Sequence, residues 1–263
     1  MKDELVEKIV QEVLKKAEAA APAAQPAVPL KAFACNITEF VGTALGETIG
    51  LVIANVDPAV HERMGIDPRY RSIGVLSGRT GAGPQIMAAD EAVKATNTEI
   101  VSIQLARDTK GGAGHGSLII FGAEEVSDAR RAVEVALKEL ERTFGDVYAN
   151  DAGHLEFQYT ARASFACNKA FSAPIGKAFG LTVGAPAGIG VVMADTAVKA
   201  ANVDAIGYAS PAKGTSFSNE VILFISGDSG AVRQALIAAR EVGLKLLGSL
   251  GAAPASVTGK PYI

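Results

Sequence analysis

The sequence predicts an α+β fold in which two diverged copies of one small domain follow each other along the chain. Three observations lead to this prediction: a segment that repeats, short β-branched runs that end in glycine, and helices with one apolar face. The copies are expected at residues 37–150 and 151–252, followed by a C-terminal tail at 253–263.

The repeat is clearest in the segments that begin at Met87 and Met193. Residues 87–101 align with residues 193–206 when one alanine after Met87 is skipped. Eight of the fourteen aligned pairs are then identical. Chance identity in an alanine-rich chain accounts for only roughly one or two such matches. The two segments are therefore copies of one predicted helix.

Strands flank each of these helices. Residues 72–78 parallel 178–184 upstream, and residues 118–122 parallel 223–227 downstream. A further strand precedes each copy, at 48–55 and 154–161. This order predicts a small antiparallel or mixed sheet with helices on one face in each copy.

A second helix closes each copy. In the first copy Ser127 is the expected cap, and in the second Asp228 or Ser229 takes that role. The spacing of apolar residues predicts the buried faces, which are Ala129, Ala132, Val133, Ala136, Leu137 and Leu140, and then Val232, Ala235, Leu236 and Ala239.

The N-terminal segment differs from both copies. Residues 1–16 combine an apolar stripe with charged residues and predict an amphipathic helix, and residues 17–36 are rich in alanine and proline and predict a linker. The segment lacks the apolar stretch of a signal peptide, and no run approaches the ~18 apolar residues of a membrane span. We therefore expect a cytoplasmic protein without a membrane partner.

Composition excludes several classes of function. A formal net charge of -3 gives no basic field for nucleic acid. The two cysteines, Cys35 and Cys167, stand far apart and predict neither a disulfide nor a metal site. His61, His115 and His154 each look isolated, and the favoured interpretation of His61 and His154 is a solvated or hydrogen-bonded surface residue. No catalytic set can be assembled, so we expect no enzyme, no metal and no cofactor.

Glycine-rich loops are the most unusual segments. RDTKGGAGHGS occupies 107–117 and SPAKGTSFSN occupies 210–219. Gly111 to Gly116 satisfies GxxxxG, but Ser117 stands where a phosphate-binding loop needs lysine. The alternative function is a nucleotide-binding or small-ligand sensor that uses this loop. A further interpretation is that the glycine-rich loops only reverse the chain direction and have no binding role.

A second pair of loops leads into the repeated helices. Its candidate residues are Arg79, Thr80, Gly81, Gly83, Gly188 and Gly190. The N–H groups at a helix N-terminus can bind an anion. An ordinary strand-to-helix turn is the favoured interpretation.

The stretch from Val192 to Tyr208, the Lys-Gly loop and VILFISGDSGAVR at 221–233 together resemble the core of bacterial microcompartment shell proteins. The tandem copies, each preceded by a strand, resemble the circularly permuted subfamily that forms trimers. The resemblance implies a structural tile in a microcompartment shell, a homotrimer that contacts other shell proteins, and pores for small polar metabolites such as 1,2-propanediol or glycerol. It also implies that the N-terminal helix contacts encapsulated enzymes.

The resemblance also assigns roles to residues. The implied pore lining is Lys110, Gly111, Gly112, Gly114, His115 and Ser117 in the first loop, and Lys213, Gly214, Thr215, Ser216, Phe217, Ser218 and Asn219 in the second. Lys94 and Lys199 occupy the position that helps tiles meet edge to edge. Neither loop contains cysteine, so no iron–sulfur cluster is expected.

Overall fold

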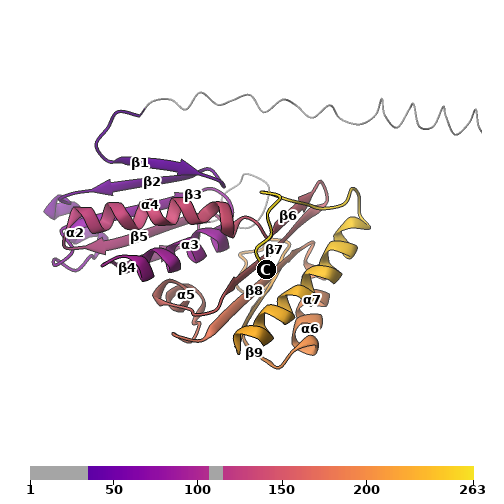
Figure 1. Ribbon diagram of the computed structural model, residues 1–263. Helices are drawn as coiled ribbons and strands as arrows, with labels where there is room; N and C mark the ends of the chain where they lie inside the picture. Colours follow the sequence, from indigo (N-terminus) through magenta and orange to yellow (C-terminus); the bar gives the residue numbers. More distant parts are fainter. Residues whose placement is uncertain (1–34, 107–114) are drawn as a thin grey trace, which may run out of the picture. The chain divides into compact units, whose positions relative to one another are not determined.

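The computed structural model describes residues 35–106 and 115–263. Residues 37–263 form one compact unit. The predicted helix at 1–16, most of the linker, and residues 107–114 of the first glycine-rich loop lie outside the described residues. Figure 1 shows the two copies, each a sheet with its helices.

The first copy contains a five-stranded antiparallel sheet in the order β1-β2-β3-β5-β4. Its strands are β1 (Phe40–Ala44), β2 (Thr48–Ile53), β3 (Ser72–Gly78), β4 (Glu99–Gln104) and β5 (Ser117–Ala123). Its helices are α2 (Pro58–Met64), α3 (Ala82–Ala95) and α4 (Val126–Thr143). The predicted strand–helix–strand–loop–strand–helix order is present.

The second copy contains a six-stranded antiparallel sheet in the order β11-β6-β7-β8-β10-β9. Its strands are β6 (Val147–Asn150), β7 (Gly153–Thr160), β8 (Ala178–Ala185), β9 (Val203–Ala209), β10 (Val221–Gly227) and β11 (Ala255–Ser256). Its helices are α5 (Phe165–Phe171), α6 (Ala187–Ala200) and α7 (Ser229–Gly248). The expected boundary at 150/151 falls inside the β6–β7 hairpin, and the tail at 253–263 supplies β11.

Each long helix packs closely on its sheet because glycines leave room for it. A Cβ on Gly50 of β2 would lie 2.5 Å from Val133 of α4, and one on Gly180 of β8 would lie 2.9 Å from Val232 of α7. The predicted buried faces of both helices are buried, except that Leu137 is only partly so. Burial of each large apolar side chain contributes about 1.5–3 kcal/mol.

The predicted cap at Ser127 is wrong. Helix α4 begins at Val126 with Glu125 in the N-cap position, so Ser127 lies inside the first turn and cannot accept from it as a cap does. Asp228 is the N-cap residue of α7, but its side chain makes no capping hydrogen bond. The packed faces, more than the caps, hold these helices in place.

The structure also corrects the register of the repeat. Ser72 pairs with Ala123, and the equivalent Ala178 pairs with Gly227, so residues 118–122 correspond to 222–226, one residue earlier than predicted. A one-residue slip moves every side chain to the opposite face. The helices α3 and α6 have the same length and match from Ala82 and Ala187. Met87 therefore corresponds to Val192, and the missing residue lies in the turn before α6.

None of the helices in the described ranges is both long and apolar enough to cross a membrane.

Candidate functional site at the seam between the two copies

One face of strand β7 carries a buried polar stripe. His154, Glu156, Gln158 and Thr160 alternate along the strand and share this face, and each is at most 8% exposed. Leu155 and Phe157 point the other way into the core of the second copy. The stripe meets the first copy, because Gln158 Nε2 donates to the carbonyl of Thr143 and Lys94 Nζ donates to Thr160 Oγ1.

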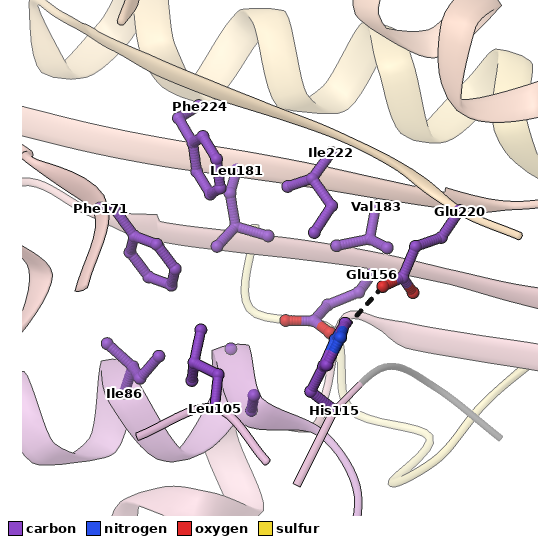
Figure 2. A pocket seen from close by; sticks show the side chains of 12 residues that line it. Ile86, Leu105, His115, Glu156, Phe171, Leu181, Val183, Glu220, Ile222 and Phe224 are labelled. Carbon is purple, nitrogen blue, oxygen red and sulfur yellow. Dashed lines mark ion pairs between the residues drawn. The ribbon is translucent and has the colours of Figure 1, made fainter. Parts of the chain in front are cut away.

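Glu220 joins the two copies at one end of this seam. Its Oε1 lies 3.4 Å from His115 Nδ1 of the first copy, and its Oε2 lies 3.4 Å from His154 Nε2 of the second. Figure 2 shows the ion pair with His115 and the neighbouring carboxyl group of Glu156. The His115 carbonyl also accepts a hydrogen bond from the N–H of Ala82, the first residue of α3. Four ionisable side chains thus gather here, and two of them are histidines that look isolated in the sequence.

The two carboxyl groups have opposite protonation behaviour. Burial, and then the negative charge of Glu220, raise the pKa of Glu156 to about 8. Burial also opposes the charge of Glu220, but hydrogen bonds and attraction from His115 and His154 outweigh it and lower the pKa to about 2. At neutral pH Glu156 is therefore a donor and Glu220 an acceptor.

Gly83 leaves room for the carboxyl group of Glu156. A Cβ on Gly83, in the first turn of α3, would lie 1.9 Å from Glu156 Oε1. With any larger residue at position 83, the carboxyl group of Glu156 would have to move away. The α3 N-terminal turn therefore approaches the carboxyl group closely.

A cavity of about 50 Å³ lies beside these groups. Its polar end is formed by His115, Glu156 and Glu220, and its other end is apolar, as Figure 2 shows. The apolar lining is Ile86, Leu105, Phe171, Leu181, Val183, Ile222 and Phe224. One water needs roughly 15 Å³ of such space, so the cavity suits a molecule of a few heavy atoms.

The interpretation of the histidines from sequence was partly wrong. His154 is buried, not a surface residue, and His115 has a carboxylate beside it. His61 Nε2 donates to the Tyr70 carbonyl at 3.0 Å, and His61 stays outside the cluster. Sequence reasoning missed Glu156 and Glu220, although the polar alternation of HLEFQYT in β7 was a signal for a second buried face.

The first glycine-rich loop is described only at its end. Lys110, Gly111, Gly112 and Gly114 lie outside the described residues, as does most of the GxxxxG motif. Ser117 is buried at the start of β5, where its carbonyl accepts from Ser77 Oγ. Of this loop, His115 alone among the described candidates lines the cavity.

The second loop forms a compact turn whose polar groups largely bond to one another. Ser210 and Lys213 exchange backbone hydrogen bonds, and Thr215 Oγ1 donates to the carbonyl of Ser218. Gly214, Ser216 and Phe217 have positive φ angles. The Phe217 ring is 84% exposed. Asn219 Oδ1 accepts from the N–H of Ala187 at the start of α6.

The loops before α3 and α6 behave as strand-to-helix turns. The Arg79 and Thr80 N–H groups both donate to the Gly46 carbonyl, and Gly81 is the N-cap residue of α3 with φ +86. Gly188 and Gly190 lie within α6; Gly190 packs on Val221, whereas a Cβ on Gly188 would meet nothing within 4 Å.

The two lysines predicted at the tile edge differ in environment. Lys94 Nζ lies 2.9 Å from both Asp90 Oδ2 and Glu91 Oε1, and its side chain is 26% exposed. Burial opposes its charge, but these carboxylates raise its pKa. Lys199 is 72% exposed and lies 2.6 Å from Asp195. An edge role for both stays a prediction.

Neither cysteine has a disulfide partner: Cys35 is exposed and Cys167 is buried. Across residues 35–106 and 115–263, no group of three or more His, Cys, Asp or Glu side chains is arranged to hold a metal ion.

The chain contains two antiparallel sheets with the same core strand order, and polar contacts join the two copies. It is therefore a protein with two tandem domains of one type. The family model described as BMC domain matches twice, at residues 72–151 and 178–254, and the matches begin at the equivalent strands β3 and β8. The chain belongs to this family.

Several proteins are similar to this chain over most of its length. The bacterial microcompartment shell protein PduB of Citrobacter freundii is 64% identical over 255 residues, which are 96% of this chain and 94% of that protein. The crystal structure of a trimeric bacterial microcompartment shell protein PduB has a TM-score of 0.83 and 55% identity, covering 86% of this chain and all of that one. The crystal structure of EtuB from Clostridium kluyveri has a TM-score of 0.84 and 58% identity, and the match covers 87% of this chain and 100% of that chain. The chain is a structural protein of a bacterial microcompartment shell, as the resemblance predicted.

Proposed function

We propose that the chain builds a trimeric shell tile in which the cavity at the seam binds small polyols, such as 1,2-propanediol or glycerol, in transit across the shell. The observation that carries this proposal is the group of His115, Glu156 and Glu220 at one end of a small, otherwise apolar cavity. Trimer formation is supported by the trimeric PduB structure, of which this chain covers the whole length.

The chemistry of the cavity suits a diol. One hydroxyl can donate to the ionised Glu220 while the protonated Glu156 donates to the other, because the pKa values place one acceptor and one donor side by side. The carbon end of the molecule then contacts Leu181, Ile222 and their neighbours. Large cofactors do not fit a space of about 50 Å³.

Ligand-detected NMR on the assembled protein tests the proposal, with 1,2-propanediol and glycerol as probes and ATP as the probe for the alternative sensor. We expect diol binding that Glu220→Gln weakens about tenfold, since a hydrogen bond to a charged group contributes about 1.5 kcal/mol or more. Glu141→Gln is the matched control, because Glu141 is exposed, pairs with Lys260 and does not line the cavity. Diol binding unchanged by Glu220→Gln, or binding of ATP in its place, would overturn it.

The N-terminal segment is the proposed contact with encapsulated enzymes. This rests on the apolar stripe of residues 1–16, which needs a partner surface. Deletion of residues 1–34 should leave tile assembly intact and weaken the co-purification of cargo with the shell. Unchanged co-purification contradicts this role.

A further inference from the structure

The fold of the repeated domain does not require the two carboxyl groups that are buried at the seam. Glu156 and Ile49 occupy the same place in the two copies, because each pairs with the sixth residue of the central strand, β8 or β3. Glu220 and Gly116 are equivalent in the same way, since each directly precedes the residue that pairs with the seventh residue of that strand. The first copy folds with an isoleucine and a glycine at these positions, so the carboxyl pair points to a function of the seam.

The carboxyl group of Glu156 has little around it that stabilises a negative charge. The side chain is 3% exposed, and its Oε1 has no hydrogen-bond partner among the residues that the structure describes. The N-terminal turn of α3 approaches this oxygen and favours an anion through the helix dipole. The N–H of Ala82 in that turn, however, already donates to the His115 carbonyl. The surroundings of Glu156 therefore suit a neutral carboxyl group.

The titratable groups near Glu156 leave the negative charge on Glu220. Both imidazoles of the cluster lie 3.4 Å from carboxylate oxygens of Glu220, and helix α3 presents only uncharged residues to the cavity. Burial and the charge of Glu220 oppose ionisation of Glu156, whereas a hydrogen bond from Gln158 favours it. The polar groups that face Glu156 are Glu220 before β10, His115 before β5, His154 and Gln158 on β7, and Tyr262 of the C-terminal tail, whose hydroxyl donates to Gln158.

Ionisation of Glu156 and occupation of the cavity by a ligand make opposite demands on the same space. Two carboxylates buried side by side repel each other and need water to solvate them. The cavity has a volume of about 50 Å³, and one water needs roughly 15 Å³. A molecule of a few heavy atoms, with its carbon atoms against Leu181 and Ile222, therefore displaces the water that a second carboxylate needs.

We propose that the cavity at the seam binds a polyol together with one proton, which is held on the carboxyl group of Glu156. This inference rests on the proposed function and adds its regulation. The protonated Glu156 donates to one hydroxyl of the polyol, and the other hydroxyl donates to the carboxylate of Glu220. Loss of the proton weakens binding of the polyol, and by linkage the bound polyol strengthens binding of the proton by the same factor.

Ligand-detected NMR on the assembled full-length protein tests the first half of this linkage, with 1,2-propanediol as the probe at pH 7 and pH 9. Because the pKa of Glu156 is about 8, a site that needs the proton loses affinity by about tenfold between these two pH values. Glu141→Gln is the matched control. It removes an exposed carboxyl group that does not line the cavity, so it should show the same tenfold loss as the wild type.

Infrared spectroscopy tests the second half on the wild-type protein. The carbonyl stretch of the protonated Glu156 is identified as the band that Glu156→Gln removes. With saturating 1,2-propanediol this band should persist to higher pH than without it, by about one pH unit for a tenfold preference. A carboxyl group that only stabilises the fold would lose its proton at the same pH with and without the diol.

The outcomes separate this inference from the proposed function. Equal diol affinity at pH 7 and pH 9, with no change in the midpoint of the infrared band, overturns the inference and leaves the diol site intact. A loss of affinity at pH 9 without any change in that midpoint also overturns it, because a group other than Glu156 then controls binding. No diol binding at either pH overturns the proposed function as well.

Discussion

Glu156 and Glu220, buried side by side at the seam between the two copies, have pKa values of about 8 and about 2. Two carboxyl groups in one site cannot both ionise cheaply, and the imidazoles of His115 and His154 decide which of them carries the charge. The copies of the duplicated domain are thereby joined by one neutral and one charged carboxyl group.

The raised pKa of Glu156 predicts a loss of stability with rising pH. The folded chain holds this proton more tightly than the unfolded chain, so the contribution is complete below about pH 4.5 and is lost as pH rises towards 8. A difference of one in pKa equals about 1.4 kcal/mol. Melting temperatures at pH 5.5 and 8.5 should therefore differ more in the wild type than in Glu156→Gln. Equal differences in both proteins would contradict the assignment.

Glu220 predicts the opposite pH dependence at low pH. Its folded pKa lies below the unfolded value, so its contribution is present above about pH 4.5 and is lost as pH falls towards 2. Urea unfolding between pH 5 and pH 3 should show a smaller loss of stability in Glu220→Gln than in the wild type. An identical acid profile for the two proteins would exclude the ionised carboxylate.

Gly83→Ala should destabilise the chain, because the new Cβ would lie 1.9 Å from Glu156 Oε1. Overpacking of this kind costs about 1–3 kcal/mol. The control is Gly230→Ala in the first turn of α7, where a Cβ meets nothing within 4 Å and alanine favours the helix. Calorimetry should show a lower melting temperature for Gly83→Ala alone; equal behaviour of the two variants would mean that the seam is looser than described.

The C-terminal residues should be essential for stability. Asp146 Oδ2 accepts the N–H groups of Tyr262 and Ile263, and Arg240 Nη1 lies 2.5 Å from Asp146 Oδ1. Removing residues 262–263 leaves a buried carboxylate short of donors, at a cost of about 3 kcal/mol. Urea unfolding should show this loss, and Asp146→Ala should add little to it in the shortened chain. Lys260→Ala, in an exposed pair with Glu141, should change little; a loss as large as that of the deletion would contradict the role of Asp146.

The variant Phe217→Gly tests whether the second loop contacts other chains. The ring is 84% exposed and its φ is +66, a conformation that favours glycine. Phe217→Gly should keep or raise the melting temperature of the isolated chain by relieving that conformation. A large decrease confined to the assembled protein would show that the ring is buried between chains.

The sequence predicted the duplication, the order of the main elements and the buried faces of α4 and α7, because periodicity and glycine punctuation are local signals. It placed Met87 opposite Met193, since identity alone cannot show whether a missing residue lies in a helix or in the turn before it. It missed the short helix α5, whose position depends on Asp90 from the other copy.

The site was harder to predict for a related reason. His115, His154 and Glu220 are far apart in sequence and meet only because the two copies pack together. The candidate loops were chosen for their glycines and a family resemblance. No residue of the second loop lines the cavity, but Glu220, which directly follows that loop, does.

Native mass spectrometry, followed by electron microscopy of the same sample, tests the central claim most directly. The account predicts a particle of three times the 27.0 kDa chain mass that assembles into extended sheets or facets. A particle that stays at the mass of one chain at every concentration, and never forms sheets, would contradict it.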